Sequence, residues 1–217
     1  MFTRNKQIPM TIKLGVTILE FKNETKNDAM WATLLTPLID RINANDTLET
    51  IRQSPEIQAT KQAYKALGKD PSRFRPSSDS LWRRVAKGKG LYQVNALVDL
   101  NNALSLTFKM PFGSYDLDKI QGDITLTKGL PGAQYPGIGK DMINIENLLV
   151  LADNQGPFGS PTSDSTTAMI NETTHRAAII AYLFDVDNDA AAHIQAEVKA
   201  TAETYLSEAS VVAQQIV

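Results

Sequence analysis

The chain has 217 residues, a formal net charge of −2, and 42% hydrophobic and 21% charged residues. This composition is typical of a globular protein, and the length favours one domain over residues 1–217. It excludes extended disorder, a collagen-like chain and a coiled coil, and the near-zero charge excludes a strongly cationic, histone-like protein.

The first half of the chain predicts one strand followed by helices. Residues 11–21 alternate apolar and polar side chains, which indicates a half-buried strand. Apolar side chains then recur at helical spacing over residues 29–42, where Pro37 predicts a kink or a break. Further helices are expected over residues 55–68, 77–87 and 92–109.

The second half favours strands, which are expected over residues 122–127, 143–152 and 177–184. Residues 129–140 and 156–167 are rich in Gly, Pro and polar residues and predict surface loops. Residues 187–215 are rich in Ala, Glu and Gln and predict one long C-terminal helix. Because the strands cluster instead of alternating with helices, we expect an α+β fold.

The chain contains no cysteine and only two histidines, His175 and His193. This excludes a disulfide framework, a cysteine-ligated zinc site and a thiol nucleophile, and we expect neither a metal nor a cofactor. No run of about 18 apolar residues is present, and the first residues lack the apolar core of a signal peptide. We therefore expect a cytoplasmic protein without membrane contact.

Charge is distributed unevenly along the chain. Residues 69–90 carry seven basic and two acidic side chains, whereas residues 185–217 carry six acidic side chains and one lysine. The basic segment could contact RNA phosphates, or it could be a solvated helix surface that packs near the acidic helix. The candidate RNA-binding residues are Arg73, Arg75, Arg83, Arg84, Lys87 and Lys89.

Two further segments could bind a ligand. Asn95, Asp99 and Asn102 are spaced by four and three residues, so they share one helix face, either as a ligand-reading strip or as a structural hydrogen-bond network. The loop 156–165 combines glycines, which allow close backbone approach, with hydroxyls that could hold a phosphate, carboxylate or ribose. The alternative is a turn-rich connection. The loop is neither a Walker motif nor a nucleophile elbow.

Several motifs in the middle of the chain follow one another in a recognisable order. Residues 94–102 read VNALVDLNN and continue without a gap to residues 111–117, PFGSYDL. The segments LVLAD at 149–153, GPFGS at 156–160 and ETT at 172–174 come after them. In order and spacing these segments resemble the B3/B4 domain, the editing domain of the phenylalanyl-tRNA synthetase beta subunit, over about residues 73–184.

The resemblance implies a Greek-key β-barrel-like core with packed helices, preceded by an N-terminal extension over residues 1–72, in a free-standing protein. In that family the domain hydrolyses the ester that joins a wrongly attached tyrosine to its tRNA. The resemblance therefore implies tRNA or aminoacyl-tRNA as partner and an editing-type hydrolase acting in trans. Two alternatives remain: a non-catalytic module that binds RNA, a nucleotide or an amino acid, and a protein–protein adaptor. An exposed stripe of Ile194, Val198, Tyr205 and Val212 would support the adaptor.

The resemblance also implies a substrate pocket, in which two polar residues of the family are missing. Gly113 stands where the family has His, and Ile179 or Ile180 stands where a Glu recognises the amino acid. An isoleucine would leave a tyrosine hydroxyl unpaired, at a cost of roughly 1–3 kcal/mol, so either the ligand differs or the site is no longer catalytic. The implied pocket residues are Asn95, Asp99, Asn102, Gly113, Ser114, Tyr115, Asp116, Phe158, Gly159, Ser160, Thr162, Ser163, Ile179 and Ile180. No catalytic residue is assigned.

Overall fold

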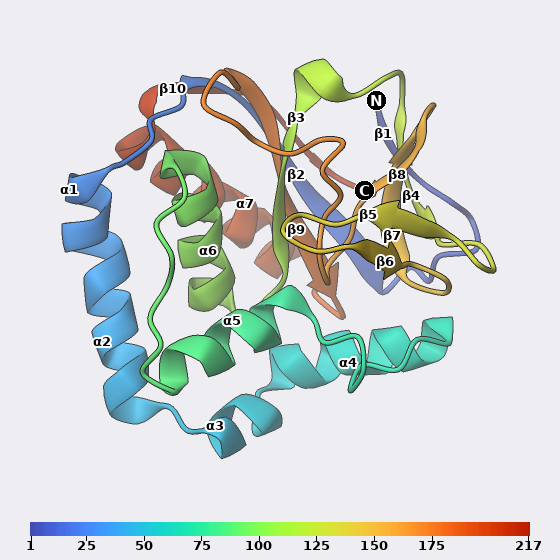
Figure 1. The fold of residues 1–217 in the computed structure, drawn as a ribbon, viewed down its shortest axis with the longest axis horizontal. Helices are drawn as coiled ribbons and strands as arrows, with labels where there is room; N and C mark the ends of the chain where they lie inside the picture. Colours follow the sequence, from blue (N-terminus) through green and yellow to red (C-terminus); the bar gives the residue numbers. More distant parts are fainter.

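In the computed structural model, which describes residues 1–217, most helices form one side of the molecule and most strands the other (Figure 1). The helices are α1 (Asp28–Met30), η1 (Trp31–Leu35, a π-helical turn), α2 (Thr36–Asn45), α3 (Leu48–Gln53), α4 (Pro55–Leu67), α5 (Ser77–Ala86), α6 (Ala96–Phe108), η2 (Leu117–Lys119, a 3-10 turn) and α7 (Asn188–Tyr205). The strands are β1 (Phe2–Arg4), β2 (Ile12–Lys22), β3 (Phe112–Asp116), β4 (Ile124–Lys128), β5 (Gln134–Pro136), β6 (Met142–Asn144), β7 (Leu149–Asp153), β8 (Gly156–Gly159), β9 (Arg176–Phe184) and β10 (Ser207–Ile216). No helix is both long and apolar enough to cross a membrane.

The strands form two four-stranded sheets, ordered β1-β4-β7-β8 and β10-β2-β9-β3, and a separate β5-β6 hairpin. All pairings are antiparallel except that of β1 with β4. The two sheets enclose a shared core of 22 buried residues in a barrel-like arrangement. The predicted α+β class is confirmed.

Strand β9 divides the interior into two cores. Its residues Ala178, Ile180, Tyr182 and Phe184 belong to the core between the sheets. Its other side chains, at positions 177, 179, 181 and 183, belong to a second core of 27 residues that the helices cover. Because successive strand residues point to opposite faces, a strand buried on both faces reads as a continuous apolar run, and β9 does so.

Local sequence signals set several boundaries as predicted. Helix α4 begins at Pro55 and ends at Leu67, and the capping Gly68 that follows has a left-handed φ of 87°, which suits glycine. The helix expected over 29–42 is interrupted by the π-helical turn η1 and continues to Asn45. Pro37 lies just after this π-helical turn within one continuous helical stretch, so its missing N–H lies where the helical hydrogen-bond pattern changes.

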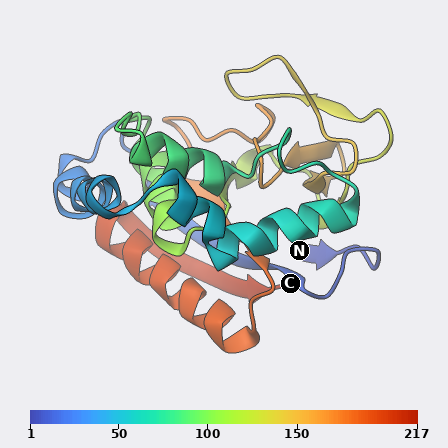
Figure 2. The same ribbon diagram turned by 90° about the horizontal axis from the view of Figure 1, so that it is seen from below.

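The predicted C-terminal helix over 187–215 is wrong in its second half. Helix α7 ends at Tyr205, and β10 pairs antiparallel with β2 (Figure 2). The Ala and Gln content favours a helix, but β2 offers β10 a ladder of backbone hydrogen bonds, and tertiary pairing overrides propensity. The stripe proposed for an adaptor is not exposed as a whole, because Ile194 and Val198 lie on the buried face of α7.

Candidate functional site

Part of the predicted pocket comes together at the junction of the two sheets, where the ring of Tyr115 fills the space. Gly113 and Gly159 face this ring from opposite sheets, and a β-carbon at either position would overlap it. The ring also packs edge-on against Phe158, with centroids 5.2 Å apart. The space between these two glycines therefore holds a side chain of the protein itself.

The two isoleucines that the sequence could not distinguish lie on opposite faces of β9. Ile180 pairs with Gly113 and belongs to the core between the sheets, together with Tyr115. Ile179 faces the core that the helices cover. Only Ile180 therefore lies at the sheet junction, and both side chains are fully buried.

The polar strip on α6 is engaged within the protein. Asn95 caps the helix by accepting a hydrogen bond from the Val98 N–H. Asp99 accepts hydrogen bonds from Trp31 Nε1 at 2.7 Å and from the Val94 N–H at 2.9 Å, and burial raises the pKa of its carboxyl. These bonds match the structural network that the sequence left open as an alternative.

The neighbouring amide Asn101 was missed by the sequence analysis. Its Oδ1 accepts a hydrogen bond from Ser114 Oγ at 2.8 Å, and its Nδ2 donates to the Phe112 carbonyl. No hydrogen bond is formed by the side chain of Asn102. Asp116 accepts a hydrogen bond from the Thr174 hydroxyl at 2.7 Å. These residues fasten β3 to its surroundings.

Three buried tyrosines hold consecutive residues of the loop after β8. The Tyr64 hydroxyl lies 2.8 Å from Thr162 Oγ1, and the Tyr135 hydroxyl donates to the Ser163 carbonyl at 2.5 Å. The Tyr115 hydroxyl donates to Asp164 Oδ1 at 2.8 Å. The tyrosines come from α4, β5 and β3, so three distant segments fix the conformation of this one loop.

Asp164 is the charged group of this arrangement. Its Oδ1 accepts a hydrogen bond from the Ser160 N–H at 3.0 Å as well as the one from Tyr115. The Tyr115 hydroxyl also lies 2.7 Å from that of Tyr182, and burial raises the pKa of both phenols. Burial raises the pKa of Asp164 to about 6, against the hydrogen bonds from Ser160 and Tyr115, which lower it.

A separate pocket of about 680 Å³, here called the cationic pocket, opens between α5, the segment before it, the β6 region and the 162–163 loop. Four cations line it, and no acidic residue does. Its lining residues are Arg73, Phe74, Arg75, Ser77, Ser80, Leu81, Arg84, Lys140, Met142, Ile143, Asn144, Thr162 and Ser163. Thr162 and Ser163 thus line this pocket and not the sheet junction.

Helical spacing gives α5 three different faces. Ser78, Trp82 and Val85 are buried in the core. Asp79, which is fully buried, forms ion pairs with Arg83 at 2.5 Å, with Lys61 of α4 at 3.0 Å and with Arg75 at 3.8 Å. A third face, with Ser77, Ser80, Leu81 and Arg84, lines the cationic pocket. Spacings of three and four residues place these last side chains together.

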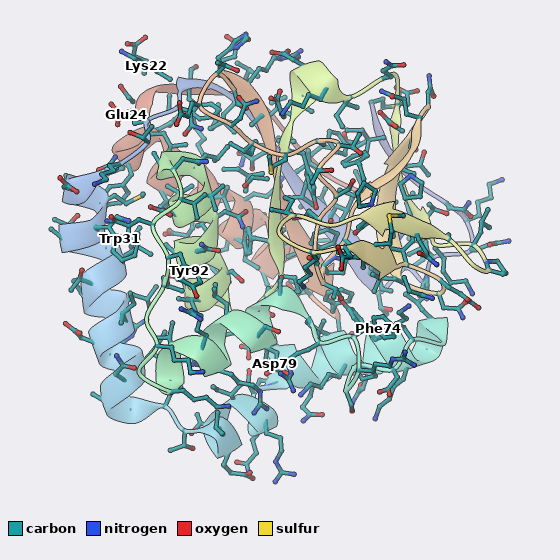
Figure 3. The ribbon with its side chains drawn as sticks, viewed as in Figure 1. Lys22, Glu24, Trp31, Phe74, Asp79 and Tyr92 are labelled. Atoms are coloured by element: carbon teal, nitrogen blue, oxygen red, sulfur yellow. The ribbon has the colours of Figure 1, made fainter.

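Lys69 holds the wall of the cationic pocket. Its Nζ donates to Asn144 Oδ1 at 3.0 Å and to the Glu146 carbonyl at 2.6 Å, and it lies 3.6 Å from the centre of the Phe74 ring. Only 5% of Lys69 is exposed, and burial lowers the pKa of its amine. Figure 3 shows Phe74 beside α4, at the other end of the molecule from Lys22.

The predicted RNA-binding residues divide into three groups. Arg73, Arg75 and Arg84 line the cationic pocket, whereas Arg83 is ion-paired with Asp79. Lys87 and Lys89 are exposed in the turn after α5. Lys140 completes the pocket from a distant loop, and no local pattern marked this lysine. No group of three or more His, Asp or Glu side chains lies close enough to hold a metal ion.

Comparison with known protein families identifies the family of this chain. The family described as B3/4 domain matches residues 59–210, which is more than half of the chain. The chain belongs to this family. The match begins within α4 and ends within β10, so it is wider than the expected span of 73–184.

The B3/4 domain protein is similar to phenylalanine–tRNA ligase beta subunits. It is 29% identical to the beta subunit of Rickettsia conorii, over 54% of this chain and 19% of that relative. It is 32% identical to the beta subunit of Bartonella quintana, over 44% of this chain and 12% of that relative. The chain thus spans a fifth or less of these relatives. A solved N-terminal fragment of the beta subunit from Pyrococcus horikoshii aligns over 99% of this chain and 49% of its own, with 13% identity and a TM-score of 0.47.

We expect Gly159→Ala to destabilise the protein, because its β-carbon would overlap the buried Tyr115 ring. Overpacking of this kind costs about 1–3 kcal/mol, or roughly 2–4 °C in Tm per kcal/mol for a chain of this size. Thermal and urea unfolding measure the change. In a Tyr115→Val background the ring is gone, and the added methyl should cost little. An equal cost in both backgrounds would contradict the filled junction.

The raised pKa of Asp164 predicts a pH dependence of stability. Because the pKa of Asp164 is higher in the folded protein than in the unfolded chain, the folded state favours the protonated carboxyl. The stability that the protonated carboxyl contributes is fully present below about pH 4 and is lost as the pH rises through about 6. Urea unfolding of the wild type and of Asp164→Asn between pH 4 and pH 8 measures this. The wild type should lose stability relative to Asp164→Asn as pH rises, whereas Asp141→Asn, an exposed control, should not show this difference. Parallel curves for wild type and Asp164→Asn would refute the assignment.

Proposed function

We propose that this B3/4 domain protein binds tRNA or aminoacyl-tRNA through the cationic pocket and the exposed lysines after α5. The observation that supports this is the convergence of Arg73, Arg84 and Lys140 on a pocket that no acidic residue lines. Cations of this kind bind phosphate oxygens and release counterions, which makes nucleic-acid binding depend on salt. The curated relatives are phenylalanine–tRNA ligase subunits, which favours tRNA as the nucleic acid.

The cationic pocket is prepared for phosphate before any ligand arrives. Arg84 Nε donates to the Gly90 carbonyl at 3.0 Å, and its guanidinium lies 4.1 Å from the centre of the Tyr92 ring. The one acidic side chain on α5, Asp79, is paired most closely with Lys61 and Arg83 and lies farther, at 3.8 Å, from Arg75 of the pocket. The pocket therefore presents positive charge with little internal neutralisation, and holding Arg84 in place lowers the entropy lost on binding.

Binding without ester hydrolysis is the activity that the sheet junction favours. Tyr115 fills the space between Gly113 and Gly159. Both histidines are exposed, neither lines the cationic pocket, and His175 lies 3.5 Å from Asp118. A water molecule would therefore lack both a cavity at the junction and an imidazole base beside it.

The binding proposal predicts that single cation removals weaken tRNA affinity and its salt dependence. Arg73→Ala and Lys140→Ala should each weaken binding of different tRNAs to the same extent, and each should reduce the slope of log K against log salt by about 1. Fluorescence anisotropy with labelled tRNA measures both. Lys22→Ala, an exposed lysine at the other end of the molecule (Figure 3), is the matched control and should change neither value. Equal affinity for all four proteins would overturn the proposal.

A deacylation assay tests the absence of hydrolysis. A panel of mischarged tRNAs, including the tRNA for phenylalanine carrying tyrosine, is incubated with protein at concentrations that saturate tRNA binding. We expect release of amino acid at the rate of the protein-free control for every member. Faster release from one member than from the protein-free control would instead identify an editing hydrolase and its substrate.

A further inference from the structure

We propose that the cationic pocket binds a nucleotide that carries a terminal phosphate, such as a free nucleoside 5′-monophosphate or the 5′-phosphorylated end of an RNA strand. This inference deepens the proposed function and rests on it for the choice of RNA as one source of the nucleotide. It assigns the phosphate and the base to different parts of the same pocket.

The charge of the pocket matches a terminal phosphate better than an internal one. Arg73, Arg84 and Lys140 bring three positive charges to one concavity without a lining carboxylate, and Arg75, which also lies 3.8 Å from Asp79, lines it as well. A phosphodiester in an RNA backbone carries one negative charge, whereas a terminal phosphate carries about −1.5 to −2 near neutral pH and has three acceptor oxygens. Arginine in particular binds such oxygens in pairs.

The first residue of α5 adds an unused donor at this place. Ser77 lines the pocket, and its buried Oγ has no hydrogen-bond partner. Its backbone N–H is already bonded to the Pro161 carbonyl at 2.8 Å, which leaves the hydroxyl as the free group. A buried polar atom without a partner is costly, so a phosphate oxygen that accepts this hydrogen bond would remove the cost. The positive end of the helix dipole acts in the same direction.

Apolar side chains in the same pocket could hold a base. Phe74, Leu81, Met142 and Ile143 line it together with the cations. Lys69 and the Asn144 amide fix the wall that carries Phe74, and 57% of Met142 is exposed. A planar base can cover such apolar and aromatic surface whatever its sequence, because every base has an apolar face. A volume of about 680 Å³ leaves room for both groups.

Calorimetry with 5′-AMP, adenosine, ribose 5-phosphate and inorganic phosphate tests whether one part of the pocket binds the phosphate and another part binds the base. We expect 5′-AMP to bind more tightly than the other three. Ser77→Ala should weaken the binding of 5′-AMP and of inorganic phosphate alike by about tenfold, because one hydrogen bond to a charged group is lost. The substitution should not lower the unfolding temperature. Met142→Ala should weaken 5′-AMP but leave inorganic phosphate unchanged. Ser210→Ala and Met169→Ala, which lie outside the pocket, are the matched controls.

A second experiment distinguishes a free nucleotide from an RNA end as the ligand, and it also tests this inference separately from the proposed tRNA binding. The same tRNA is prepared with a 5′-phosphate and with a 5′-hydroxyl, and its affinity is measured with and without 5′-AMP as competitor. Tighter binding of the phosphorylated form, by about tenfold, and competition by 5′-AMP support an RNA end as ligand. Tight 5′-AMP binding without any tRNA binding supports a free nucleotide and rejects the proposed function.

Two results would overturn the inference. Equal affinity for both tRNA forms, with no competition by 5′-AMP, would reject a terminal nucleotide and leave tRNA binding standing. Inorganic phosphate that binds as tightly as 5′-AMP, with no effect of Met142→Ala, would reduce the pocket to a simple anion site.

Discussion

Three buried tyrosine hydroxyls, each bonded to one residue of the segment 162–164, are the contacts on which the rest of the structure depends. Tyr115 has the central position, because its ring separates Gly113 from Gly159 and its hydroxyl reaches Asp164. Tyr115 therefore fills the sheet junction and holds Asp164, while Tyr64 and Tyr135 hold Thr162 and Ser163 in the wall of the cationic pocket. The three tyrosines together link the sheet junction to the wall of this pocket.

Helix α5 connects this framework to the charge distribution of the molecule. Its core face is anchored by Trp82, whose Nε1 donates to Asp46 Oδ2 at 2.7 Å. Asp79 draws Lys61 and Arg83 to the α4 side, while Arg84 stays on the pocket side. Burial of an ion pair is costly unless each charge has a good partner, and Asp79 has two close ones. The helix thus directs Arg83 toward Asp79 and Arg84 toward the pocket, while Arg75 lines the pocket and also lies 3.8 Å from Asp79.

The proposed phosphate-binding role rests on this charge distribution. At the sheet junction, the ring of Tyr115 occupies the space between Gly113 and Gly159. Recognition of phosphate needs only converging donors and positive charge, which α5, the segment before it and the loop at Lys140 supply together. Membership of the B3/4 family describes the scaffold, and every residue that lines the cationic pocket lies within the part of the chain that matches this family.

The sequence by itself determined the elements whose signals are local. Apolar periodicity and capping residues predicted β2, α4, α5, β9 and the α+β class, and the basic segment before and within α5 was visible as composition. It could not distinguish Ile179 from Ile180, exclude a helix for β10, or mark Lys140, because each depends on pairing between segments far apart in the chain. Tertiary structure alone decided that the ring of Tyr115 occupies the space between Gly113 and Gly159. These glycines lie on different sheets, so the space that holds the ring exists only once the two sheets have packed together.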